Sequence, residues 1–250
     1  IREKMDFSAA LKMAQELGYA ERNPDADVLG HDACRKICIL ASLAFGKHIY
    51  PDAVHTEGIS GITLSDVKYA AAWGGVIKLI GKVKRLENKM CDIVVAPMFV
   101  PNKSQLANID DVFNGIMVRG DCTGDVVFYG KGAGKLPTAS AVVADIIDCV
   151  KHLKNRKYLF WTDSDNSSVI DYKESVTAMY IRAITSDKAT AYTKAKELFK
   201  DIHILEVADA EDNEIAFVCE PTTYSTILEN IDSLNGCGIK VESAIRIGDL

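Results

Sequence analysis

The segment GHDACRK at residues 30–36 places three charged side chains directly before the apolar run ICILASLAFG. In a helix over this segment, Asp32 and Lys36 are four residues apart and share one face. The simplest interpretation is an exposed ion pair, which stabilises a helix by a few tenths of a kcal/mol. Alternatively, Lys36 lies partly desolvated near the positive end of the helix dipole, which lowers its proton affinity and suits a general acid. Because no further charge follows before Lys47, the helix is predicted to be buried, which favours the second interpretation, with Asp32 orienting Lys36.

A polar loop precedes this helix and carries Glu21, Asp25 and Asp27. These residues either form a solvated acidic loop or include a carboxylate that receives the ammonium group of a substrate. Their spacing alone does not decide between the two interpretations.

The segment GKGAGKLPT at residues 130–138 follows a predicted strand and precedes a predicted helix. Glycines in this position allow a tight turn, and they also allow a phosphate to approach the helix N-terminus. The pattern differs from a Walker A loop, because Leu136 stands where Ser or Thr is required, and its G-x-G-x-G spacing differs from G-x-G-x-x-G. A plain turn and a phosphate contact at Gly130, Gly132 and Gly134 therefore both remain open.

The elements around these motifs indicate an α+β chain. A helix is predicted from Ser8, as N-cap, to Leu17, and another after a capping box of Thr63 and Asp66. Strands are predicted over 76–84 and 91–99 and in NGIMVRG and DVVFYG, followed by a helix to about Leu153. We therefore predict a mixed-sheet domain at 1–153 and a linker at 154–175. Residues 176–250 follow the order βαββαβ, which is typical of a ferredoxin-like domain with both helices on one face of the sheet.

Composition excludes several classes of protein. The net charge is −6 with acids and bases interspersed, so nucleic acid is not expected as a partner. The apolar runs are too short to cross a bilayer, so no membrane partner is expected. The seven cysteines form no C-x-x-C pair, which argues against zinc and a disulfide framework and for reduced thiols in the cytoplasm. The chain begins at Ile1 rather than Met, which suggests a fragment of a longer protein.

Three separated stretches resemble homoserine dehydrogenase. They are residues 7–46, the segment EGISGITLSDVKYAAAWGGVIKLIG, and the segment from VAPMFVPNKSQL to KGAGKLPTASAVVADI. The resemblance covers most of residues 7–149 and implies an oxidoreductase that interconverts L-homoserine and L-aspartate 4-semialdehyde with NAD or NADP, for threonine and methionine synthesis.

The resemblance also implies residue roles. The family's catalytic lysine and aspartate match Lys36 and Asp32, and its substrate-binding glutamate matches Glu21. Its Gly-rich cofactor segment matches GKGAGKLPTA, with Gly134 as the first candidate for cofactor contact and Gly132 as the next.

The chain departs from the family at its start, because no strand followed by G-x-G-x-x-G is present. In the family, a Rossmann domain there supplies a second active-site lysine, a monovalent-cation site and most of the cofactor contacts. We therefore expect the chain alone to be inactive, and the segment that selects NAD or NADP to lie outside it.

The last part, residues 176–250, resembles an ACT domain, a module that senses amino acids. The usual D-x-P-G-V turn is replaced by SDKATAY, so binding of threonine and a purely structural or dimerising role are both open. A homodimer is expected, because the strands over 76–129 have too few helices to cover both faces of their sheet. The alternative to the enzyme is a binding module that senses an amino acid or dimerises, with a vestigial active site.

Overall fold

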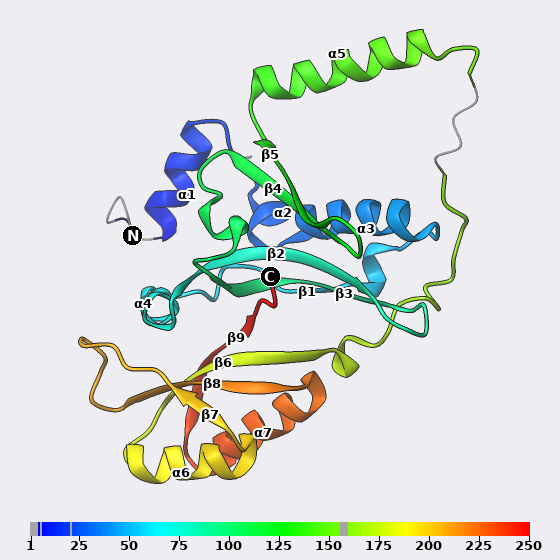
Figure 1. Cartoon of the computed structure of the whole chain (residues 1–250). Helices are drawn as coiled ribbons and strands as arrows, with labels where there is room; N and C mark the ends of the chain where they lie inside the picture. Colours follow the sequence, from blue (N-terminus) through cyan, green and yellow to red (C-terminus); the bar gives the residue numbers. More distant parts are fainter. Residues whose placement is uncertain (1–4, 6, 21, 156–159) are drawn as a thin grey trace. The chain divides into compact units, whose positions relative to one another are not determined.

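The computed structural model describes residues 5, 7–20, 22–155 and 160–250. It divides into two compact units, one made of residues 1–24 and 104–160 and the other of residues 25–103 and 161–250 (Figure 1). These units are defined by contacts within the chain. The domains predicted at 1–153 and 176–250, with a linker at 154–175, remain a prediction.

The larger unit is built on one sheet. Its strands run in the order β1-β3-β9-β6-β8-β7, with β2 paired to β3. They are β1 (His55–Thr56), β2 (Gly75–Arg85), β3 (Cys91–Pro101), β6 (Val176–Ile184), β7 (Ile202–Ile204), β8 (Glu214–Thr223) and β9 (Lys240–Ile247). Because β1–β3 and β3–β9 are parallel and the other pairs are antiparallel, the predicted α+β class with a mixed sheet is confirmed.

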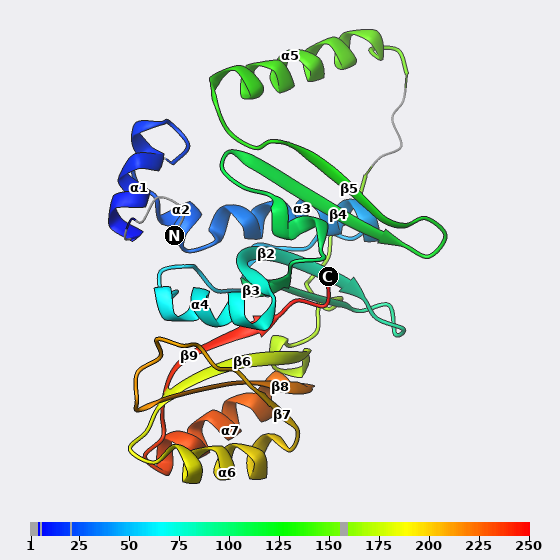
Figure 2. The same ribbon diagram turned by 60° about the vertical axis from the view of Figure 1, so that its left-hand side comes forward.

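Helices cover this sheet in separate places. The α-helices of the unit are α2 (Asp25–Val28), α3 (His31–Phe45), α4 (Leu64–Trp73), α6 (Lys188–Phe199) and α7 (Tyr224–Gly236). Short 3-10 helices lie at η1 (Pro51–Ala53) and η3 (Tyr172–Glu174). Figures 1 and 2 show α6 and α7 side by side on one face of β6–β9, whereas α4 lies on the other. The βαββαβ order predicted after residue 176 is therefore present, with both helices on one face.

Alternating strand residues form the cores of the larger unit. Met179, Ile181 and Phe217 pack with α6 and α7 in one cluster. Tyr180 and Phe99 belong to a cluster on the opposite face, with residues of α4. Strand β3 therefore joins the α3 region to the ferredoxin-like strands through its pairing with β9.

The smaller unit contains α1 (Phe7–Glu16), η2 (Gln105–Asn108), β4 (Phe113–Gly120), β5 (Gly124–Lys131) and α5 (Lys135–Lys151). Strands β4 and β5 form a two-stranded antiparallel sheet, as predicted from NGIMVRG and DVVFYG. The predicted N-cap Ser8 is wrong, because α1 begins at Phe7 and includes Ser8. No described residue of α5 is buried.

The prediction that α3 is buried is correct for only one of its faces. Cys34, Ile37 and Cys38 are buried, whereas Ile39 and Leu43 are 53% and 38% exposed. Apolar side chains occur on both the buried and the exposed sides of α3. On the exposed side, Ile39 and Leu43 follow Asp32 and Lys36 along the helix.

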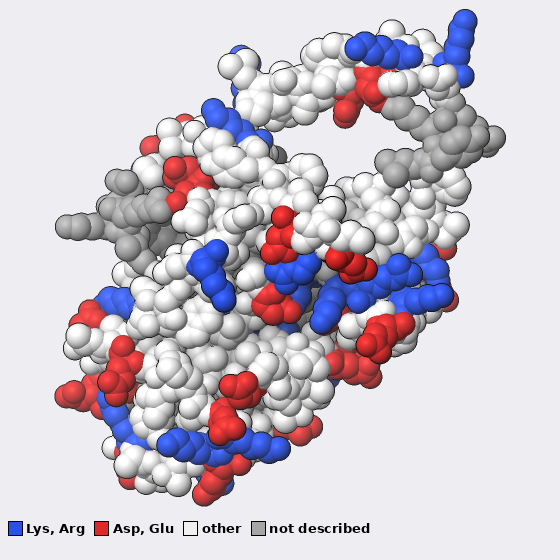
Figure 3. All heavy atoms as spheres, viewed as in Figure 1, with Lys and Arg blue, Asp and Glu red and all other residues white. Residues whose placement is uncertain are grey.

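The surface carries both signs of charge. Basic and acidic groups are interspersed on the face in Figure 3. Among the described residues, no helix combines the length and apolar character that a membrane span requires.

Candidate functional site

The first turn of α3 is held by close contact with the segment after β1. Gly30 precedes the helix in the left-handed region, with φ of 79°. A Cβ atom on Gly30 would lie 3.2 Å from the Glu57 carbonyl oxygen. Ile59 N donates to the Val28 carbonyl oxygen at 2.8 Å, which joins the two segments. The local sequence thus fixes where α3 begins.

Gly58 completes this contact and gives a first test of it. A Cβ atom on Gly58 would lie 2.7 Å from Leu29 Cα and closer still to the Val28 carbonyl oxygen, so the backbone must shift. We expect Gly58→Ala to lower the free energy of unfolding by about 1–3 kcal/mol in urea denaturation. Gly61→Ala is the matched control, because nothing lies within 4 Å of a Cβ there. Equal stability of the two variants would contradict the close contact.

Asp32 and Lys36 form the predicted pair. Lys36 Nζ lies 2.7 Å from Asp32 Oδ2, and the two side chains are 55% and 43% exposed. The expected desolvation of Lys36 is therefore wrong for this chain, because the stripe on which it lies is open to solvent. The pair can hold an ammonium in a fixed place, and its contribution to stability is small at this exposure.

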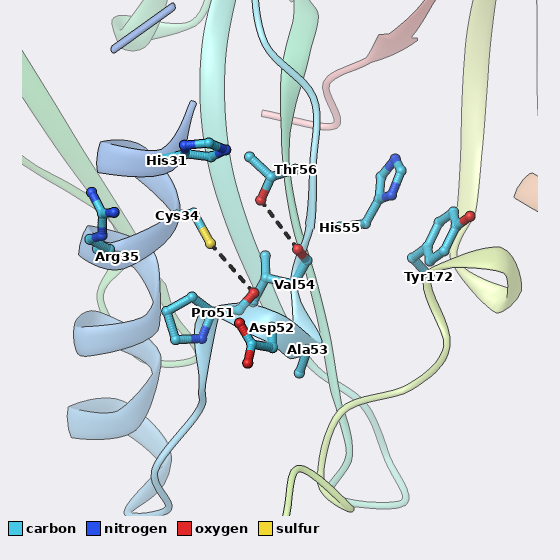
Figure 4. A pocket seen from close by; sticks show the side chains of 10 residues that line it. All are labelled: His31, Cys34, Arg35, Pro51, Asp52, Ala53, Val54, His55, Thr56 and Tyr172. Atoms are coloured by element: carbon cyan, nitrogen blue, oxygen red, sulfur yellow. Dashed lines mark hydrogen bonds between the residues drawn. The ribbon is translucent and has the colours of Figure 1, made fainter. Parts of the chain in front are cut away.

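A hollow of about 600 Å³ lies between α3, η1, β1 and η3, and neither Asp32 nor Lys36 is among its lining residues (Figure 4). His31, Cys34 and Arg35 line it from α3, and Asp52 from η1 faces them. The remaining lining residues are Pro51, Ala53, Val54, His55, Thr56 and Tyr172. Sequence reasoning missed this site, although the density of His, Asp and Tyr in KHIYPDAVHT offered a signal.

An ionic and aromatic cluster lies next to the hollow. His55 Nε2 lies 2.7 Å from Glu57 Oε1, and the His55 ring stacks on Tyr172 with centroids 4.0 Å apart. The Arg246 guanidinium lies 4.1 Å from the centre of the Tyr224 ring. Burial opposes ionisation of Glu57, but its hydrogen bond with His55 and the charge of Arg246 hold its pKa below the usual range. The cluster fixes the strand that forms one wall of the hollow.

The other predicted site residues do not lie in the same compact unit as Asp32 and Lys36, or are not described by the structure. Gly132 and Gly134 belong to the smaller unit, between β5 and α5. Gly134 adopts a φ of 115°, which only glycine adopts readily, whereas a Cβ atom on Gly132 would require the Asn114 side chain to move. Glu21 lies outside the described residues.

The chain is an α+β protein with a mixed sheet, and the Asp32–Lys36 ion pair lies near the N-terminus of helix α3. A family model described as homoserine dehydrogenase matches residues 1–147. The homoserine dehydrogenase of Helicobacter pylori is 35% identical over 241 residues, 93% of this chain and 56% of that protein. That of Pseudomonas aeruginosa is 47% identical over 152 residues, 60% of this chain and 35% of that protein.

A solved structure supports the same assignment over the whole chain. The homoserine dehydrogenase of Thiobacillus denitrificans has a TM-score of 0.85 at 32% identity, covering 99% of this chain and 60% of that one. The chain belongs to the homoserine dehydrogenase family. It spans between 35% and 60% of the length of these three relatives.

Proposed function

We propose that this chain is part of an NAD- or NADP-dependent homoserine dehydrogenase, which interconverts L-homoserine and L-aspartate 4-semialdehyde on the route to threonine and methionine. The observation that carries the proposal is the Asp32–Lys36 pair, at 2.7 Å in the first turn of α3 in a member of this family. A cytoplasmic location is part of the proposal, and all seven cysteines are free thiols, as a reducing compartment requires.

The proposed chemistry assigns proton transfer to Lys36. The ammonium donates a proton to the oxygen of the semialdehyde carbonyl as negative charge develops on it, and accepts a proton in the reverse direction. Asp32 orients the ammonium and balances its charge. Bound NAD or NADP exchanges the hydride with the substrate carbon.

Two further parts of the site are proposed from the resemblance. Glu21 holds the α-ammonium of the substrate through a charge-assisted hydrogen bond. Gly134 and Gly132 border the cofactor where α5 begins, because a helix N-terminus preceded by glycines can accept an anionic group. The positive φ of Gly134 fits a turn that only glycine forms readily.

The ferredoxin-like part is proposed to act as an ACT-like regulatory domain over residues 176–250, with an amino acid such as threonine as effector. In this chain Asp187 caps α6 by accepting from Thr190 N at 3.2 Å. The segment SDKATAY therefore forms an ordered strand–helix turn without the Pro and Gly of the usual motif.

The test is homoserine-dependent reduction of NADP and NAD by the product of the complete reading frame, measured beside this 250-residue chain. Activity of the longer product alone supports the proposal. Absence of activity from both, when both are folded and bind an amino acid, favours the binding module with a vestigial site.

We also propose a homodimer formed through the exposed face of β4 and β5 that carries Ile116, Val118, Val126 and Phe128. Ile116 pairs with Phe128 and Val118 with Val126, and these four side chains are all exposed. Because a two-stranded sheet alone is marginally stable, a second copy packing on this face is expected to stabilise it.

Sedimentation tests the dimer directly. The wild-type chain is expected to sediment as a dimer, and Phe128→Asp as a monomer. Lys131→Asp is the control, because Lys131 is exposed on the same strand with its side chain on the opposite face. A wild-type monomer, or equal dissociation of both variants, would contradict this interface.

A further inference from the structure

Two thiols lie one helical turn apart on α3, and the first of them, Cys34, lines the hollow. Cys34 and Cys38 are both 4% exposed and belong to the core cluster under α3. Cys34 lines the hollow, and its Sγ donates to the Pro51 carbonyl oxygen at 3.8 Å, a long and weak contact (Figure 4). The thiol is therefore withdrawn from bulk solvent but borders a space that a small molecule can enter.

Several neighbours of Cys34 lower the pKa of its thiol, whereas the weak contact with the Pro51 carbonyl oxygen is made by the protonated form. A hydrogen bond from the Cys38 thiol is the largest cause that lowers the Cys34 pKa. Burial opposes it, and a hydrogen bond with Thr56 and the charges of His31 and Arg35 lower the pKa further. The same hydrogen bond raises the pKa of Cys38, which keeps its proton. The other lining groups that titrate are Asp52 on η1, His55 on β1 and Tyr172 on η3. Asp52 carries the carboxylate among the lining residues, and its negative charge acts against the effect of His31 and Arg35.

We propose that Cys34 is a site of oxidative modification by a small hydroperoxide that enters the hollow, and that Cys38 resolves the product as a disulfide within α3. The Cys34 sulfur attacks the terminal peroxide oxygen, the O–O bond breaks, and the leaving oxygen takes the thiol proton. This step gives a sulfenic acid and an alcohol, or water from hydrogen peroxide. The Cys38 sulfur then attacks the sulfenic sulfur, and hydroxide leaves with the Cys38 proton as water.

The geometry of a helix permits this second step with a local change. Residues four apart in an α-helix have Cα atoms about 6 Å apart, which lies within the range of disulfides. Their Cβ atoms are about 5–6 Å apart and must approach to about 4 Å, so the turn has to tighten. Lys36 lies between the two cysteines and Asp32 lies two residues before Cys34, so a tightened turn would alter the spacing of the Asp32–Lys36 pair. The inference concerns the chain's own thiols and does not rest on the proposed dehydrogenase activity.

The wild-type chain contains two internal references for the experiment. Cys91 is buried in the same core cluster, and burial raises its pKa, whereas Cys149 is exposed. The folded chain is treated with iodoacetamide across pH 5.5–8.5, and separately with hydrogen peroxide, and each cysteine is quantified by mass spectrometry. Trypsin cleaves after Arg35 and Lys36, so a Cys34–Cys38 disulfide joins two separate peptides and is recognised directly.

We expect Cys34 to reach half its maximal alkylation rate about one pH unit or more below Cys149, and Cys91 to remain unmodified. Peroxide should join the two peptides in the wild type, and Cys38→Ser should stop at a sulfenic acid that a 1,3-diketone traps. Cys34→Ser should leave Cys38 unmodified. Oxidation of Cys34 no faster than Cys91 would overturn the proposed site, and a sulfenic acid without the disulfide in the wild type would overturn the role of Cys38. Because the wild type carries both references, either result counts even where a variant fails to fold.

Discussion

Replacing Lys36 with alanine in the complete protein is expected to lower kcat by about 10²–10⁴-fold with little change in KM for homoserine. Loss of a general acid removes stabilisation that exists only in the transition state, so kcat falls while ground-state binding remains. Lys36→Arg should also be impaired, because a guanidinium keeps the positive charge but does not release a proton readily. The measurement is steady-state kinetics with saturating cofactor in both directions.

The exposure of the pair separates a catalytic role from a structural one. Because Lys36 and Asp32 are 55% and 43% exposed, their removal should change the free energy of unfolding by only about 0.5 kcal/mol. Lys47→Ala is the matched control, since Lys47 is exposed just beyond the end of the same helix. If Lys36→Ala keeps more than a tenth of wild-type kcat, Lys36 is not the proton donor.

Local features of the fold could be predicted because neighbouring residues determine them. Thr63 and Asp66 form the predicted capping box, with Asp66 N donating to Thr63 Oγ1 at 3.3 Å and Thr63 N to Asp66 Oδ2 at 2.9 Å. Gly74 ends α4 in the left-handed region, which glycine adopts readily. Such signals need only a few consecutive residues.

Features that depend on distant parts of the chain could not be predicted in this way. The alternation in β2 and the apolar run of β3 are typical of strands but carry no information that β3 pairs with β9, about 150 residues later. Likewise, the apolar sequence of α3 predicted that the whole helix is buried. Ile39 is exposed because it lies on the side of the helix that does not pack on the sheet. For the candidate site, the Asp32–Lys36 spacing was sufficient, but the hollow is formed by three further segments and required the structure.

Arg182 illustrates the same limit and gives the largest expected effect on stability. It lies on β6 with its side chain 9% exposed, between two carboxylates that are almost completely buried. Arg182 Nε donates to Asp66 Oδ1 and Nη1 to Glu214 Oε2, each at 2.9 Å. Tyr180 and Tyr69 each donate to one of these carboxylates, so every partner of the arginine is itself hydrogen-bonded. The network joins α4 to β6 and β8.

Arg182→Met should lower the free energy of unfolding by about 3–5 kcal/mol, because it leaves two buried carboxylates without their cation. Arg119→Met is the matched control, since Arg119 pairs with Asp125 at an exposed position and its loss should cost at most about 1 kcal/mol.

Burial opposes ionisation of Asp66, but hydrogen bonds from Arg182 and Thr63 outweigh it and hold its pKa below the usual range. The stability from this lowered pKa is therefore present above about pH 4 and lost as the pH falls further. Urea denaturation of both variants at neutral pH and of the wild type below pH 4 measures these effects, and equal losses from Arg182→Met and Arg119→Met would show that the buried network does not stabilise the fold.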